Sequence, residues 1–254
     1  MSSDVRSNRN RSDALGRLND VMGSIHPTYE RRKRLRRWLI EAGAENLPDY
    51  ELLQVMLFTS NPRADVESLV GELLERFGSL AEVISADTDE LAATGLSLAA
   101  IAGVKFVREA ALRFMRAELQ QRPLIGSWDK LIEYCTAQIS YNKIEEFHIL
   151  FLDRRNALIR DERHQRGTID HTQVYTREVI KRALELGASG LILVHNHPSG
   201  DSTPSGADIS ATNDIAKAAA IFNIAVHDHL IIGRGRYTSL RDLGILPFQS
   251  ALIT

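Results

Sequence analysis

The chain of 254 residues is longer than one hydrophobic core usually serves, so we expect two domains, and its 44% hydrophobic and 25% charged residues exclude disordered, collagen-like and disulfide-scaffold proteins. Its 31 Lys and Arg against 33 Asp and Glu give a net charge of -2, so any surface for nucleic acid must be local. The single cysteine leaves metal binding to histidine and carboxylate, and the lack of an apolar signal core or of about 20 consecutive apolar residues predicts a cytoplasmic protein without a membrane partner.

The N-terminal segment is polar and basic. Residues 1–26 are predicted to form a flexible tail, and a helix with an apolar stripe of Leu35, Trp38 and Leu39 follows. Six basic residues lie within seven positions of this helix: Arg31, Arg32, Lys33, Arg34, Arg36 and Arg37. Two interpretations stay open, a solvated helix face and a contact with nucleic acid or a partner.

Residues 27–122 are predicted to form an all-helical module. The apolar residues after Pro48 have helical spacing, and Gly78 and Gly95 lie where short connections between helices should fall. The polar segment ahead of Pro123 ends this periodicity. We therefore expect the second domain at residues 127–254.

The second domain is predicted to be α+β, with a mixed β-sheet flanked by helices, because the hydrophobic period changes in this half of the chain. Thr176 is the expected N-cap of its second helix, and Gly187 the expected stop. The predicted helices cover 128–139, 176–184 and 206–222. The predicted strands cover 145–152, 157–160, 163–168, 191–194 and 224–233. The wholly apolar segment 191–194 is typical of a strand that is covered on both faces.

A cluster of potential metal ligands follows this apolar strand. His195 and His197 alternate in extended chain, so their imidazoles can converge on one point. Ser205 is the expected cap of the next helix, and the carboxylate of Asp208 in its first turn can approach both histidines. Two imidazoles and one carboxylate suit zinc and leave a fourth tetrahedral position for water. The alternative is a structural capping pair, Ser205 with Asp208, next to an unrelated pair of histidines.

The pattern H-x-H-x(7)-S-x-x-D from His195 to Asp208 resembles the JAMM (MPN+) metalloprotease signature, in its form in the bacterial RadC-like (UPF0758) proteins. Segments 30–35 and 49–53 are similar to the N-terminal helical module of that family, and segments 228–233 and 237–240 are similar to its closing strands. The resemblance implies a JAMM/MPN-like sheet of cytidine-deaminase-like topology after a helix-hairpin-helix-like module.

The same resemblance implies a site and a chemistry. His195, His197 and Asp208 correspond to ligands of one Zn2+ per chain, and Ser205 to a residue that stabilises the oxyanion at the scissile carbonyl. The family pattern also requires a strand glutamate as general base. The implied activity is zinc-dependent hydrolysis of a peptide or isopeptide bond in a protein or peptide substrate.

Two neighbouring glutamates could supply that base. Strand alternation sends Glu145 and Glu146 to opposite faces, so only one can reach the metal, and placement relative to Phe147 favours Glu145. Glu178 is a distant third candidate that is better explained by a helix dipole. The register of the strand leaves Glu146 open as the alternative.

Other features leave rival functions open. A helix-hairpin-helix contacts phosphates through a Gly-x-Gly turn, whereas segment 95–103 lacks that doublet, so DNA contact depends on the basic cluster. His227 and His229 are expected on one strand face, as outer partners of the site or as histidines bonded to backbone carbonyls. The rival functions are a DNA-repair-associated nucleic-acid-binding protein or metal-dependent nuclease, and a non-catalytic zinc-bearing interaction scaffold.

Overall fold

The computed structural model describes residues 29–60, 66–121, 123–167 and 175–246. Contacts divide the chain into two compact units, Met1–Lys105 and Phe106–Thr254, and the division falls within helix α6 (Leu98–Gln121). The predicted tail 1–26 lies outside the described residues, and the predicted domain limits stay a prediction. The two units are described separately below.

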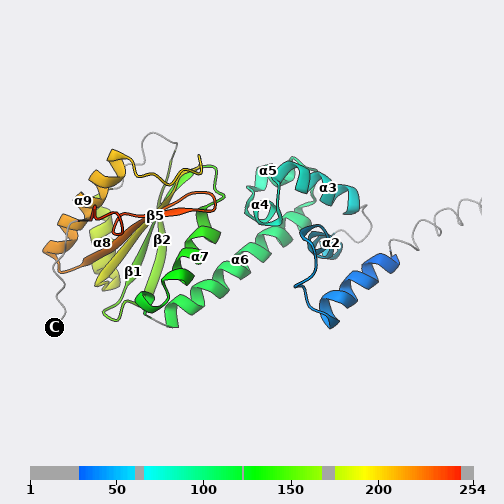
Figure 1. Cartoon of the computed structure of the whole chain (residues 1–254), viewed down its shortest axis with the longest axis horizontal. Coiled ribbons are helices and arrows are strands. Elements are labelled where there is room, and N and C mark those ends of the chain that lie inside the picture. Colours follow the sequence, from blue (N-terminus) through cyan, green and yellow to red (C-terminus); the bar gives the residue numbers. More distant parts are fainter. Residues whose placement is uncertain (1–28, 61–65, 122, 168–174, 247–254) are drawn as a thin grey trace, which may run out of the picture. The chain divides into compact units, whose positions relative to one another are not determined.

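The first unit is helical, as predicted (Figure 1). Residues 29–41 form a helix, and the following elements are α2 (Asp49–Ser60), α3 (Val66–Phe77), α4 (Leu80–Ser85), α5 (Thr88–Ala92) and the start of α6. Gly78 directly follows α3 and Gly95 lies in the turn between α5 and α6, so both lie in helix connections as predicted; their φ values of 96° and 79° are left-handed, a conformation that glycine adopts at low cost. Short turns therefore join short helices.

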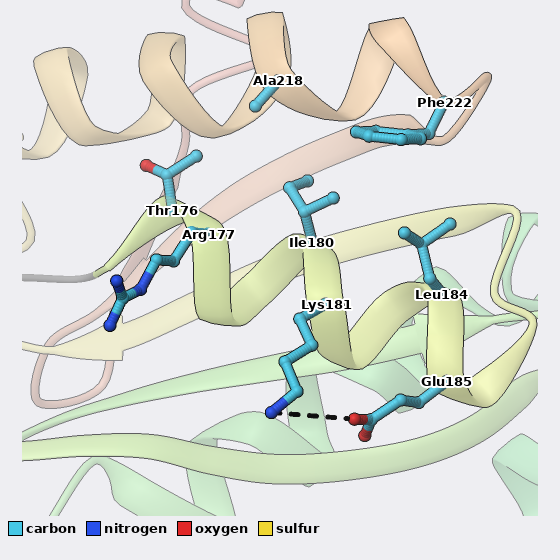
Figure 2. Close-up of a pocket in the computed structure, with 8 residues that line it drawn as sticks. All are labelled: Thr176, Arg177, Ile180, Lys181, Leu184, Glu185, Ala218 and Phe222. Carbon is cyan, nitrogen blue, oxygen red and sulfur yellow. Dashed lines mark ion pairs between the residues drawn. The ribbon is translucent and has the colours of Figure 1, made fainter.

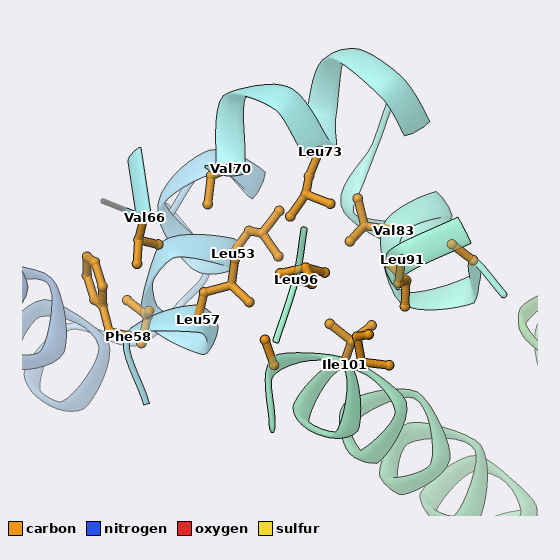
Figure 3. Packing of buried hydrophobic residues seen from close by; sticks show 14 of the residues in the cluster. Leu53, Leu57, Phe58, Val66, Val70, Leu73, Val83, Leu91, Leu96 and Ile101 are labelled. Carbon is orange, nitrogen blue, oxygen red and sulfur yellow. The ribbon is translucent and has the colours of Figure 1, made fainter. Parts of the chain in front are cut away.

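The core of this unit consists of leucine, valine, isoleucine and phenylalanine side chains from these helices (Figure 3). Leu35 is completely buried and Leu39 packs against the cluster. Trp38 is 38% exposed, so the predicted apolar stripe of its helix is narrower than expected.

The basic cluster of residues 31–37 is divided between packing and solvent. Arg31 forms a 3.0 Å ion pair with Glu67, and the guanidinium of Arg32 lies 4.7 Å from the ring centroid of Phe58. The side chains with exposed positions are Lys33, Arg34, Arg36 and Arg37. Arg31 and Arg32 therefore serve packing within the unit, and the two interpretations of the cluster, a solvated face or a contact with nucleic acid or a partner, stay open for the four exposed residues.

The second unit contains a five-stranded mixed sheet of order β2-β1-β3-β4-β5, which confirms the predicted α+β class. β3 and β4 are parallel and all other neighbours are antiparallel. The strands are β1 (Glu145–Leu152), β2 (Leu158–Gly167), β3 (Gly190–Asn196), β4 (Ala225–Ile232) and β5 (Tyr237–Ser239).

The prediction of two short strands at 157–160 and 163–168 is wrong, because β2 runs unbroken from Leu158 to Gly167. Its pairing with β1 shifts register twice, opposite Phe147/His148 and opposite Phe151/Leu152. The predicted strands left out Asp161 and Glu162. Asp161 instead stays in the ladder, opposite Leu150, and its side chain is 1% exposed.

Helices cover both faces of the sheet. One face, called here the α7 face, packs on α7 (Trp128–Ile139), and the other, the α8/α9 face, packs on α8 (Thr176–Leu186) and α9 (Gly206–Ile221) (Figure 1). Side chains of β3 alternate between the two cores, which explains its apolar sequence. Ile192 and Val194 pack on the α7 face; Leu191 and Leu193 pack on the α8/α9 face.

Local capping determines where these helices begin and end. The prediction that Thr176 is the N-cap of α8 is wrong: Thr176 is the first helical residue, and Tyr175 occupies the N-cap position without a side-chain capping hydrogen bond. Gly187 ends α8 with φ of 63°, as predicted. Ser205 caps α9, also as predicted. No helix in the described ranges has the length and hydropathy needed to cross a bilayer.

Candidate metal centre

Three predicted ligands meet where β3 ends and α9 begins. His195 is the sixth residue of β3 and 1% exposed, and Asp208 lies in the first turn of α9. His195 Nε2 lies 3.0 Å from His197 Nε2 and 3.2 Å from Asp208 Oδ1. His197 Nε2 lies 3.6 Å from Asp208 Oδ2. Among the described residues, these three form the one group whose nitrogen and oxygen atoms are close enough to hold a metal ion.

The spacing of these atoms is close to that around a tetrahedral zinc ion. Ligand atoms at about 2.0–2.2 Å from tetrahedral zinc are separated from each other by about 3.3–3.6 Å. The two Nε2 atoms lie slightly closer than this, at 3.0 Å, and Asp208 lies at 3.2 Å from His195 through Oδ1 and at 3.6 Å from His197 through Oδ2. Two imidazole nitrogens and one carboxylate oxygen also match the donor set that zinc accepts in catalytic sites with an open position.

The outer ring nitrogens of both histidines have partners that fix the ring tautomers. His197 Nδ1 lies 2.7 Å from the carbonyl oxygen of Asp201, so Nδ1 must carry the proton that it donates there. His195 Nδ1 lies 2.8 Å from His229 Nε2. His229 Nδ1 lies 2.5 Å from Thr212 Oγ1, and that hydroxyl also donates to the Asp208 carbonyl. We assign Nδ1–H to both ligand histidines, which leaves their Nε2 lone pairs facing the centre.

Burial and charge favour the ligand forms of His195 and Asp208, whereas they raise the pKa of His197. Burial is the main cause that lowers the pKa of His195 to about 4. The Asp208 carboxylate raises the pKa of His197 most, and Glu145 adds a smaller effect in the same direction. Burial opposes ionisation of Asp208, but His197, His195 and Ser205 together lower the pKa of that carboxyl. A neutral His195 and an ionised Asp208 are the forms that bind a metal.

Ser205 and Asp208 form the capping pair that the sequence left as an alternative to a metal site. Ser205 Oγ accepts from the Asp208 N–H (3.2 Å) and donates to Asp208 Oδ2 (2.7 Å), and the Ser205 N–H donates to the same oxygen (2.7 Å). Both interpretations, a capping pair and a metal site, apply to Asp208, because the capping hydrogen bonds also orient its carboxylate toward the histidines. The oxyanion role of Ser205 stays a prediction.

The two candidate glutamates lie on different faces of β1. Phe147 pairs with His195 in the β1–β3 ladder, and their rings stack at 6.2 Å on the α8/α9 face. Glu145 precedes Phe147 by two residues and therefore shares this face. Glu146 shares the face of His148, which it contacts at 3.3 Å. The register thus brings Glu145, and not Glu146, to the side of the histidines.

Sequence reasoning missed a second polar cluster, on the α7 face, defined here as Glu146, His148 and Asp161 with their partners. His148 lies between the two carboxylates at 3.3 Å from each. Glu146 is also paired with Arg163 (3.1 Å) and Arg166 (3.4 Å). Asp161 accepts from Tyr134 (2.5 Å) and Gln138 (2.8 Å). The signal in the sequence was weak, since only the spacing of Glu146 and His148 is local.

The remaining histidines behave differently from their predicted pairing. His227 and His229 do not share a face, because the β3–β4 pairing shifts register between Leu191 and Ile192. Val226 and His229 both face α8/α9, while a Cβ on Gly190 would lie 2.6 Å from His227 Nε2. His229 is an outer partner bonded to side chains. His171 lies outside the described residues.

Two further features lie apart from the centre. Glu178 is partly exposed and pairs with Arg177 at 3.0 Å. An open apolar groove lies between α8 and α9 and includes Ile180, Leu184 and Phe222 (Figure 2). Ala218, which lines this groove, follows Asp208 by ten residues in α9. The groove residue and the metal ligand are therefore about 15 Å apart along the helix axis. Neither feature contributes a group to the metal centre.

Comparison with known proteins shows which family this chain resembles. A family model described as the RadC-like JAB domain matches residues 125–245. A UPF0758 protein of Rhodobacter capsulatus is 50% identical over 213 residues, which cover 84% of this chain and 100% of that relative. A UPF0758 protein of Ruegeria pomeroyi is 48% identical over 223 residues, or 87% and 100% of the two chains.

Proposed function

The chain belongs to the UPF0758 family and carries a RadC-like JAB domain of the JAMM-like metal-dependent hydrolases, and on that premise we propose that it is a zinc-dependent peptidase. The proposed substrate is a protein or peptide, cleaved at a peptide or isopeptide bond. The proposed ligands of one zinc ion are His195, His197 and Asp208, with Glu145 as general base.

One observation carries this proposal. Three side chains direct nitrogen and oxygen atoms at a common point with separations of 3.0 to 3.6 Å, while the outer nitrogens of both histidines are hydrogen bonded elsewhere. Structural zinc sites use four protein ligands, whereas catalytic sites use three and keep one position open. Three ligands therefore favour a catalytic centre over a structural one.

In this proposal, different residues of the chain have different roles in amide hydrolysis. Zinc, when bound, polarises the scissile carbonyl and lowers the pKa of water. Glu145 accepts the proton of the attacking water and passes it to the leaving nitrogen. The Ser205 hydroxyl, which donates to Asp208 Oδ2 in this structure, would have to turn toward the substrate to stabilise the oxyanion.

A single metal group supports a peptidase over a two-metal nuclease. Two-metal phosphoryl chemistry needs a second cation about 3.5–4 Å from the first. In the part of the chain that the structure describes, no second group of metal-binding side chains is present. The carboxylates on the α7 face are neutralised by arginine and histidine instead.

The test is a metal analysis of the purified protein, followed by assays on peptides, isopeptide-linked peptides and DNA with the same preparation. We expect about one zinc per chain and cleavage of peptide or isopeptide bonds, lost on chelation and restored by zinc. Cleavage of DNA alone would replace the proposal with the nuclease alternative. Zinc without any hydrolysis would favour the interaction scaffold.

We also propose a weak contact of the N-terminal unit with DNA. Its support is the exposed set Lys33, Arg34, Arg36 and Arg37, since nonspecific phosphate contact requires only local cations. Replacing Arg34 and Arg36 with glutamine should weaken binding of a DNA duplex and flatten its salt dependence. An unchanged salt slope would assign these residues to a solvated helix face.

A further inference from the structure

Asn196 lies between the two histidines of the metal centre and is completely buried. Its Oδ1 accepts a hydrogen bond from the backbone N–H of Glu146 at 2.8 Å. Its Nδ2 donates to the backbone carbonyls of Asn142 at 3.1 Å and Ile144 at 3.2 Å. The side-chain amide thus binds three backbone groups at the entry to β1, fifty or more residues away in sequence.

This amide continues the β1–β3 ladder beyond the last backbone pair. Backbone pairing of these strands runs from Leu152 with Gly190 to Phe147 with His195. In the same register, Glu146 is the next residue opposite Asn196, and there the side chain provides the acceptor. A carboxamide offers the same acceptor and N–H donors as a peptide group, so it can substitute for one.

The main chain of β3 is meanwhile directed to the other neighbouring strand. The N–H of His197 donates to the carbonyl of Ile232 in β4 at 3.0 Å. At this end of the sheet the segment that carries the two histidines is therefore hydrogen bonded to β4 through its main chain. The hydrogen bonds that connect it with the entry of β1 come from the Asn196 side chain.

The geometry points to Asn196 as a positioning residue, which fixes the place of Glu145 relative to His195 and His197. Glu145 lies between two residues whose backbones this amide binds, Ile144 and Glu146. The inference rests on the proposed function, because Glu145 is the proposed base. It also assigns a role to the residue inside the histidine pair, which touches neither the proposed metal nor the proposed substrate.

The bonds involve backbone atoms of the β1 entry, so only a change of Asn196 itself removes them. Asn196→Ala leaves one N–H and two carbonyls without their partner. Asn196→Asp has the same shape and keeps the acceptor but loses both N–H donors, to Asn142 and Ile144, and it serves if the alanine variant does not fold. Val194→Ala is the matched control, because Val194 is buried in the same strand on the α7 face and makes none of these hydrogen bonds.

The experiment uses full-length protein loaded with Co2+, whose unpaired electrons shift NMR signals according to their distance and direction from the ion. We expect Asn196→Ala to bind Co2+ with wild-type stoichiometry. The shift of the Glu145 methylene signals should change, and the Glu146 amide should exchange with solvent about tenfold faster or more. On a peptide cleaved by the wild type, kcat should fall on the order of a hundredfold, because small misplacements of a reacting group have such effects. KM should stay unchanged.

The outcomes separate this inference from the proposed function. An unchanged Glu145 shift in Asn196→Ala with bound Co2+ would overturn the positioning role. The same change of shift in Val194→Ala would show that general destabilisation of the strand causes it, and this result would also overturn the positioning role. If wild-type protein bound no Co2+, the proposed function would fail, and the exchange rate of the Glu146 amide would then decide whether Asn196 holds this junction.

Discussion

Two clusters of ionisable side chains lie on opposite faces of one sheet. Neighbouring residues of β1 face them: Glu145 faces the metal centre, and Glu146 belongs to the cluster on the α7 face. On the α7 face, Glu146 is paired with two arginines and His148 lies between two carboxylates. On the α8/α9 face, the described contacts of the Asp208 carboxylate are with histidines and Ser205 and include neither arginine nor lysine. One cluster compensates its charges internally, whereas the other directs its lone pairs at a common point.

This difference explains why two similar sets of residues should do different things. A buried carboxylate needs a compensating cation or several hydrogen bonds. Arginines and a histidine supply that compensation to Glu146, so the cluster on the α7 face needs no metal. At the metal centre, a divalent cation would compensate the charge of the Asp208 carboxylate and bind the lone pairs of the two histidine Nε2 atoms. Charge compensation, rather than the count of histidines and carboxylates, therefore distinguishes a metal centre from a structural network.

The largest effect should come from breaking the metal centre. His197→Ala leaves two ligands, too few to hold zinc usefully against water. Zinc should therefore fall from about one per chain to near zero, with hydrolysis abolished. Mass-spectrometric metal analysis after dialysis checks this. Near-stoichiometric zinc in the variant would remove His197 from the site.

Changing the proposed base should affect turnover and leave the metal. Glu145→Gln keeps the size of the side chain and its ability to hydrogen bond, but the amide cannot accept a proton. We expect kcat to fall on the order of a hundredfold or more with zinc still bound. Steady-state kinetics beside metal analysis measure both quantities. Loss of zinc would make Glu145 a ligand instead.

The same change at the neighbouring position should affect stability. Glu146→Gln should leave zinc content unaltered, since this side chain faces α7. It should lower the free energy of unfolding by about 1–2 kcal/mol, because the amide weakens contacts with Arg163 and His148. Orientation away from the metal would by itself predict a silent substitution. The weakened contacts with Arg163 and His148 should instead make it destabilising. Urea unfolding of the metal-free protein tests this, and a selective loss of turnover would exchange the roles of Glu145 and Glu146.

The smallest effect should be a change in pH dependence on the α7 face. Burial disfavours charged His148, but Asp161 and Glu146 outweigh burial and raise the pKa of His148 above its ordinary 6.5. The same contacts lower the pKa of Glu146 and of Asp161. The carboxylates therefore stay ionised near neutral pH. The stabilisation by His148 is complete below pH 6.5 and disappears as pH rises through its raised pKa.

A comparison of wild type with His148→Gln isolates this contribution. The difference in unfolding free energy between the two proteins should shrink as pH rises from about 6 to 9. Urea unfolding at several pH values, both proteins metal-free, measures it. A difference that is constant over this range would show that folding does not change the pKa of His148, and it would contradict the prediction.

The sequence by itself determined the features that depend on short, fixed spacings. Alternation placed His195 and His197 on one side of a strand, and the spacing of three residues predicted the cap between Ser205 and Asp208. Helical periodicity likewise predicted the all-helical character of the first unit and the limits of α7. These features need only local geometry, which the chain carries within a few residues.

Tertiary structure alone decided the features that depend on register between distant segments. The pairing of Phe147 with His195 places Glu145 beside the histidines, and the register shift in β4 separates His227 from His229. The role of Asn196 and the partners of Glu146 depend on contacts 50 and 17 residues apart in sequence. Strand register is set by hydrogen bonds and packing across the whole sheet, and a shift of one residue reverses every side chain.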